Sequence, residues 1–146
     1  MLAERGHAMR EALARLAGRS EWGVKALAEP RPPAAPFPEQ AGGAGYLLRK
    51  QQERRSREQS EAAVQGAVRE CHERLEREAV AAQMLPAQSR EVAGYSGEMV
   101  FNAAYLVDDD RAEAFRRAVG ELDRPGLTVE LTGPWPAFHF AEERAA

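Results

Sequence analysis

The chain has 146 residues, of which 44% are hydrophobic and 29% charged, with 20 basic and 23 acidic side chains and a formal net charge of -3. This length fits one core, and the charge balance gives no general attraction to nucleic acid or to an anionic membrane. The first residues include acids and no continuous apolar run, so we expect neither a signal peptide nor a membrane span. The single cysteine, Cys71, excludes an internal disulfide framework and a thiolate metal cluster. We therefore expect a soluble, cytoplasmic protein.

The N-terminal residues predict one helix and one strand. Apolar side chains recur at helical spacing up to Gly18, and the following stretch "SEWGVKALAE" alternates, with Trp22, Val24 and Ala26 on one face. A single strand leaves its backbone donors and acceptors unpaired. We therefore interpret residues 1–29 as the remnant of a first domain, with an unpartnered strand at 21–29.

A long helix is predicted after a linker. Residues 30–43 are rich in proline and glycine and form the linker, whereas the chain from about 45 to 84 has no proline and almost no glycine. The stretch 49–61 carries no apolar side chain, so we expect that part of the helix to be solvated. Further along, Val64, Ala67, Val68, Cys71, Leu75 and Ala79 form an apolar stripe that must dock on a sheet or on another helix.

The remaining elements predict a compact sheet. Residues 98–107 are apolar on both alternating faces, as in a central strand. Residues 110–122 form a helix that places Phe115 on its apolar side, and 127–132 alternate as a half-exposed strand. The fold class is therefore α+β: a long helix plus a small strand-helix-strand sheet in a C-terminal domain over 44–140, preceded by the helix-strand remnant and followed by a tail at 141–146.

Enzyme signatures are absent from the sequence. Cys71 and His72 are adjacent on a helix and do not face each other, and the three aspartates 108–110 stand where a helix cap is expected, with Asp110 and Glu113 at capping-box spacing. His7, His72 and His139 have no zinc-site spacing, and there is no phosphate loop or serine elbow. We expect no catalytic residue, cofactor or metal; an enzyme would need a pocket that joins His139 to a carboxylate.

An alternative from another class is a nucleic-acid-binding regulatory module. Its basic helix face would consist of Arg49, Arg54, Arg55 and Arg57, whose charges would release counterions on binding phosphates. Glu53, Glu58 and Glu61 interrupt this face, so a solvated helix is the simpler interpretation.

The C-terminal aromatic stretch is the candidate binding site. Pro134 and Pro136 restrict the backbone on either side of Trp135, and Phe138 and Phe140 follow. Two interpretations stay open: Trp135 closes the small core as a lid, or it belongs to a partner-binding surface together with these neighbours and with Trp22.

Five segments together resemble the gas vesicle protein family GvpF/GvpL. They are "EWGVK" (21–25), "GYLLRKQQERRSRE" (45–58), "GEMVFNAAYLV" (97–107), "RAEAFRRAV" (111–119) and "LTGPWPAFHF" (131–140), in family order over roughly residues 10–142. The resemblance implies a non-enzymatic structural or assembly protein of the gas vesicle, with two α+β domains. It also implies binding to the hydrophobic main shell protein GvpA and to other Gvp proteins, with no nucleic acid or membrane as partner.

Two departures from the family pattern bear on this prediction. Family members carry a longer first domain, with several strands before the position of Leu2, which suggests a misplaced start codon or a truncated paralogue. Ala137 and Phe138 also replace the proline and tyrosine with which the family continues its Gly-Pro-Trp-Pro motif. We expect the shell protein to bind by groove packing or by strand addition, with the strand 127–132 as one exposed edge and the strand 21–29 as another.

Overall fold

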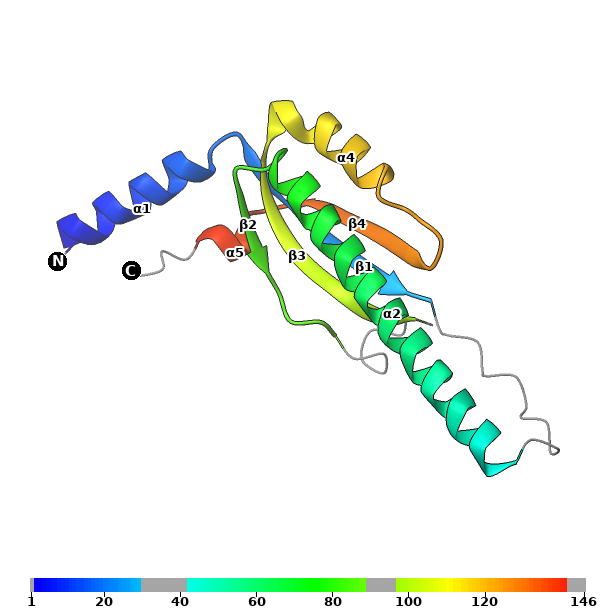
Figure 1. Ribbon diagram of the computed structural model, residues 1–146. Coiled ribbons are helices and arrows are strands. Elements are labelled where there is room, and N and C mark those ends of the chain that lie inside the picture. The colour runs from blue at the N-terminus through cyan, green and yellow to red at the C-terminus, as the bar shows by residue number, and fades with distance from the viewer. Residues whose placement is uncertain (1, 30–41, 89–96, 142–146) are drawn as a thin grey trace.

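The computed structural model describes residues 2–29, 42–88 and 97–141 (Figure 1). The linker predicted at 30–43 and the tail predicted at 141–146 lie almost wholly outside these residues. The elements in chain order are α1 (Leu2–Leu16), β1 (Arg19–Ala28), α2 (Gly43–Glu76), β2 (Ala81–Met84), β3 (Glu98–Asp108), the 3-10 turn η1 (Asp109–Arg111), α4 (Ala112–Gly120), β4 (Leu127–Trp135) and α5 (Phe138–Ala141). The predicted α+β class is confirmed.

The described strands form one antiparallel sheet in the order β2-β3-β1-β4. β1 therefore lies inside the sheet, where it pairs with β3 from Arg19 opposite Asp108 onward and with β4 on its other side. The expectation that the strand at 21–29 is an unpartnered edge is wrong, because strands far along the chain satisfy its backbone groups. The strand of the segment 1–29 and those of the segment 44–140 share this sheet; the origin of residues 1–29 as a domain remnant stays a prediction.

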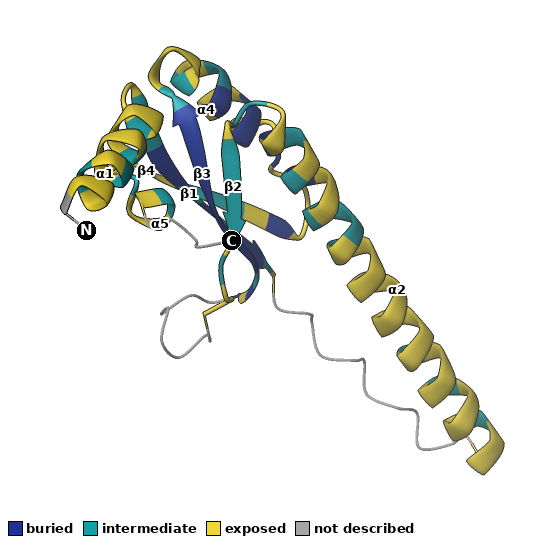
Figure 2. Cartoon of the chain, turned by 90° about the vertical axis from the view of Figure 1, so that its left-hand side faces the viewer, coloured by how far each residue is buried: buried dark blue, intermediate teal, exposed yellow. Residues whose placement is uncertain are grey.

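The core lies between the sheet and the helices α2 and α4 (Figures 1 and 2). β3 is buried continuously from Phe101 to Val107, which confirms it as a central strand. The ring centroid of Phe115, on α4, lies 6.1 Å from that of Trp22 and 5.5 Å from that of Tyr105. These three rings join α4 to β1 and β3 in a small core.

α2 is shorter than predicted: it ends at Glu76, and residues 81–84 form the strand β2. The amides of Glu78 and Ala79 close the helix by donating to the carbonyls of Leu75 and Glu76, and the amide of Val80 already donates to Leu106 of β3 at 2.7 Å. The helix prediction to residue 84 is wrong because pairing with β3 outweighs local helix propensity.

The two halves of α2 differ as predicted. Cys71 and Leu75 are buried against the sheet, whereas residues 49–61 project away from it and are almost all exposed (Figure 2).

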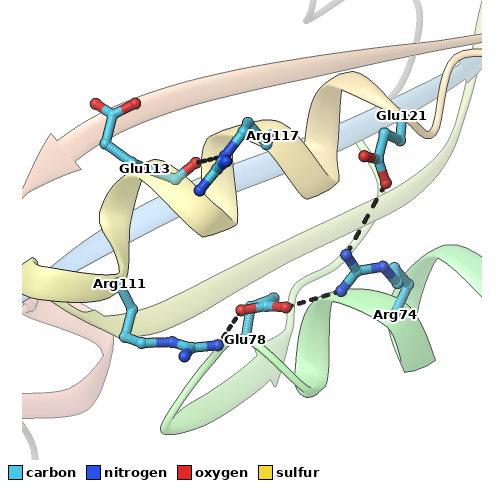
Figure 3. Close-up of polar contacts among 6 residues, drawn as sticks. All are labelled: Arg74, Glu78, Arg111, Glu113, Arg117 and Glu121. Carbon is cyan, nitrogen blue, oxygen red and sulfur yellow. Dashed lines mark hydrogen bonds and ion pairs between the residues drawn. The ribbon is translucent and has the colours of Figure 1, made fainter.

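A cluster of charged side chains ties the end of α2 to η1 and α4 (Figure 3). Arg74 Nη1 donates to Glu78 Oε1 at 3.0 Å, and Arg111 donates to the other oxygen of that carboxylate. Arg74 also lies 3.9 Å from the Glu121 carboxylate. The hydrogen bonds from Arg74 and then Arg111 hold the pKa of Glu78 below its ordinary value.

The burial of Phe115 generates the first prediction. Phe115→Ala removes a ring that is 0% exposed, and we expect the free energy of unfolding to fall by about 3–5 kcal/mol. Chemical denaturation measures this loss. Glu113→Ala, at an exposed position of the same helix, should change stability by less than about 0.5 kcal/mol. Equal stabilities for the two variants would contradict the packing described above.

The Glu78 cluster generates a second prediction, on pH. Because the pKa of Glu78 is lowered in the folded state, its contribution to stability is present above the unfolded pKa and is lost as the pH falls through the folded value. We expect Glu78→Gln to be less stable than the unchanged chain at neutral pH, with a difference that narrows on acidification. Urea unfolding over a pH series tests this, with Glu113→Gln as the exposed control. A difference that is constant with pH would mean that Glu78 is not stabilised as a carboxylate.

Candidate functional site

The last described residues of the chain, 133–141, form what we call the aromatic segment. It includes the end of β4 and the short helix α5. Trp135 is 53% exposed and Phe138 is 71% exposed, while Phe140 is half-buried and both Pro134 and Pro136 are exposed. Trp135 therefore does not close the core as a lid. Two large aromatic side chains stand on the surface beside rigid proline backbone.

Glu21 of β1 holds the aromatic segment on the sheet. The side chain of Glu21 is 7% exposed. One carboxylate oxygen accepts the backbone N–H of His139 at 2.9 Å, and the other lies 2.7 Å from His139 Nδ1. The structure thus joins His139 to a carboxylate, the pairing that the enzyme interpretation requires. Because both oxygens contact His139, the observed role of the pair is to fix the position of α5.

Close backbone approach at Gly133 explains the glycine of this motif. Its φ of 124° lies in a region that favours glycine, and an added Cβ would lie 2.9 Å from the carbonyl oxygen of Glu21 and 3.2 Å from Trp22 Cε3. Trp22 itself is 3% exposed and is covered by Arg116, whose guanidinium carbon lies 5.1 Å from the ring centroid. Trp22 was predicted to be a partner contact, but it supports the segment from the core.

The site continues across the sheet as a row of cross-strand partners. Trp135 pairs with Glu21, Glu21 with Leu106, and Leu106 with Ala81 of β2. Cross-strand partners lie on the same face of a sheet. The row thus runs from the aromatic segment to the opposite edge.

A groove of about 750 Å³ lies at the β2 end of this row. Its lining comprises Arg15, Arg19, residues 80–84, Leu106, His139 and Phe140. Arg15 Nη2 donates to the carbonyl of Phe140 at 2.6 Å, and Arg19 Nη1 donates to the carbonyl of Arg15 at 2.6 Å. The first bond joins α1 to α5 and the second joins β1 to α1, so that these elements form one wall of the groove.

The other candidate residues are not brought to this site. The four arginines 49, 54, 55 and 57 lie on the projecting half of α2, where Arg49 faces Glu53 at 3.7 Å. Cys71 is buried, and burial raises the pKa of its thiol. His72 turns away from it, with Nδ1 2.8 Å from Tyr105 Oη and Nε2 2.7 Å from Glu76.

The aspartates at the end of β3 have structural partners. Asp108 accepts a hydrogen bond from Arg19 and Asp109 accepts one from Ser20, both at 2.8 Å. No side-chain cap forms at η1 or α4, so the predicted capping box is wrong. Within residues 2–29, 42–88 and 97–141, no three His, Cys, Asp or Glu side chains are placed so that they could hold a metal ion together. In that same part of the chain, no helix combines the length and apolarity that crossing a membrane requires.

Solved gas vesicle proteins share this fold. GvpF from Microcystis aeruginosa is similar with a TM-score of 0.65 at 14% identity, over 97% of this chain and 62% of that one. GvpF from Anabaena sp. gives a TM-score of 0.61 at 18% identity, over 92% of this chain and 55% of that one. At these identities the likeness concerns the fold.

Sequence similarity gives the family. The family described as gas vesicle synthesis protein GvpL/GvpF matches residues 1–142, so the chain belongs to that family. Gas vesicle protein L from Streptomyces sp. is 42% identical over 137 residues, which cover 89% of this chain and 51% of that protein. The chain thus spans about half the length of this relative. The predicted resemblance to GvpF/GvpL is confirmed.

Sequence reasoning missed Glu21, Arg15 and the β2 edge. Glu21 is out of phase with the apolar positions of its strand, so the alternation placed it toward solvent, and only the fold brings α5 over it. Arg15 contacts a backbone carbonyl 125 residues away. No local signal in the sequence indicates such a contact.

The close approach at Gly133 gives a third prediction. Gly133→Ala should lower the free energy of unfolding by about 1–3 kcal/mol, because the new methyl group meets Glu21 and Trp22 at a strained φ. Gly66→Ala is the matched control: it lies inside α2, its added Cβ meets nothing within 4 Å, and it should stabilise the chain by about 0.5–1 kcal/mol. Thermal or urea unfolding of both variants measures the opposite signs. A stabilised Gly133→Ala variant would contradict the docking of the aromatic segment.

Proposed function

We propose that this chain is a non-enzymatic assembly protein of the gas vesicle, located at the vesicle in the cytoplasm, and that it binds the main shell protein GvpA or other Gvp proteins. Membership of the gas vesicle synthesis family supports the process. The observation that supports binding is the exposure of Trp135 and Phe138 on a segment that Glu21 and two prolines hold in place.

The physics of interfaces favours this surface. Aromatic side chains are enriched among the residues that carry most of the binding energy, because they bury a large area while few torsions are fixed. Binding costs less when the segment is already ordered. In the free chain, the main-chain and side-chain contacts of His139 to Glu21 already order α5. An apolar shell subunit could therefore bind both rings without first organising their backbone.

The role of Trp135 and Phe138 is tested by co-purification after co-expression with GvpA. Trp135→Ala and Phe138→Ala should each reduce capture by about tenfold or more, the effect of losing more than about 1.4 kcal/mol at a binding hot spot. Their thermal unfolding should stay close to that of the unchanged chain, because both side chains are largely exposed.

Tyr46→Ala is the control for this experiment. Tyr46 is 48% exposed and lies at the far end of α2, so its removal should leave capture unchanged. Failure of the unchanged chain to capture GvpA or any other Gvp protein would contradict the proposed function. Equal losses for Tyr46→Ala and Trp135→Ala would contradict the assignment of the site.

A further inference from the structure

The two edges of the sheet differ in their free backbone groups. At β4 the amide of Val129 donates to Asp123 Oδ1 at 3.0 Å, and the amide of Leu127 donates to the carbonyl of Arg124 at 3.0 Å. At the other end of the strand, Pro134 has no N–H to donate. Much of the β4 edge is thus already occupied or lacks donors. Strand addition at 127–132 was predicted from the sequence, but these contacts disfavour it.

The β2 edge is open by comparison. The amide of Leu85 donates to the carbonyl of Asn102 on β3 at 2.8 Å. Backbone direction alternates along an antiparallel strand, so the groups of Ala81 and Gln83 also face β3, whereas those of Ala82 and Met84 face away. In the sheet formed by the described residues, no strand lies beyond β2. Two residues of β2 therefore present both an N–H and a C=O outward.

The side chains beside this edge indicate the chemistry of its partner. Val80 is 46% exposed and Met84 is 54% exposed, so the edge is flanked by apolar surface. The adjoining groove contains Arg15 and Arg19. Asp108 pairs with Arg19, whereas Arg15 has no carboxylate within 4 Å in the described part of the chain. Apolar flanks, with one cation that has no carboxylate partner among the described residues, fit an apolar strand that carries a carboxylate.

We infer that the β2 edge binds an extended apolar segment of a partner protein as a fifth strand, with a carboxylate of that segment at Arg15. The backbone groups of Ala82 and Met84 form the new ladder, and Val80 and Met84 contact the partner's apolar side chains. Phe140 of the aromatic segment lines the groove together with residues 80–84, so one partner can contact both the edge and the aromatic segment. The inference rests on the proposed function, since the partner is a gas vesicle protein.

Substituting proline for Met84, whose backbone groups face away from β3, tests the inference. Met84→Pro removes one outward N–H without removing a bond to β3, and proline is tolerated at such positions of edge strands. With co-expressed GvpA as the probe, we expect capture to fall by about tenfold, whereas Met84→Thr, which keeps the N–H, should lose less. Arg15→Glu should also weaken capture, because it places a negative charge beside the partner's carboxylate. Arg15→Lys keeps the positive charge and should largely retain capture.

A second measurement covers the case in which Met84→Pro fails to fold. In the unchanged chain the amide of Met84 should exchange hydrogen rapidly, and this exchange should slow at least tenfold in the purified complex. Unchanged exchange at Met84, or full capture by a folded Met84→Pro variant, would overturn strand addition at β2 and leave the proposed function standing. Absence of capture by the unchanged chain would contradict both.

Discussion

Backbone pairing of β1 is the constraint on which this fold depends. A strand inside a sheet has its hydrogen-bonding groups satisfied on both sides, and β1 obtains them from β3 and β4. Without β1 those two strands would not belong to one sheet, and Trp22 would not meet Phe115 in the core. The N-terminal segment is therefore structural for the whole described molecule. Its position also explains why a short linear motif, "EWGVK", lies beside the aromatic motif more than 100 residues later.

Glu21 converts that proximity into a defined surface. Burying a carboxylate costs free energy unless hydrogen bonds compensate for the lost water. His139 contacts both oxygens of Glu21, one through its backbone N–H and the other through its ring nitrogen Nδ1. The cost of burial is thus offset only when α5 is docked. Gly133 permits the same contact from the other direction, because a side chain there would collide with the backbone of Glu21. The order of the aromatic segment is consequently a property of β1 as much as of the segment.

Much of the fold follows from local patterns, while its connections do not. The burial of Phe115 and Cys71 and the central place of β3 follow from periodicity alone. The end of α2 does not, because residues 77–84 have helical composition, yet the helix ends at Glu76 and residues 81–84 form a strand through pairing with β3. At the site, the sequence identifies the aromatic segment but leaves open whether Trp135 is buried or exposed. Trp22 is buried rather than exposed, and Glu21 is recruited by contacts distant in sequence. The patterns predict elements, and the long-range backbone pairing decides their neighbours.

The side chain of Asp123 has a consequence for the growth of assemblies. Asp123 accepts a hydrogen bond from the outward amide of Val129 on β4, so that amide is not available to pair with another strand at this edge. If strand addition is limited to the β2 edge, as we infer, copies of this sheet cannot stack edge to edge into a fibre. Under the proposed function, a chain with one receptive edge would bind a partner segment there without becoming part of a continuing polymer.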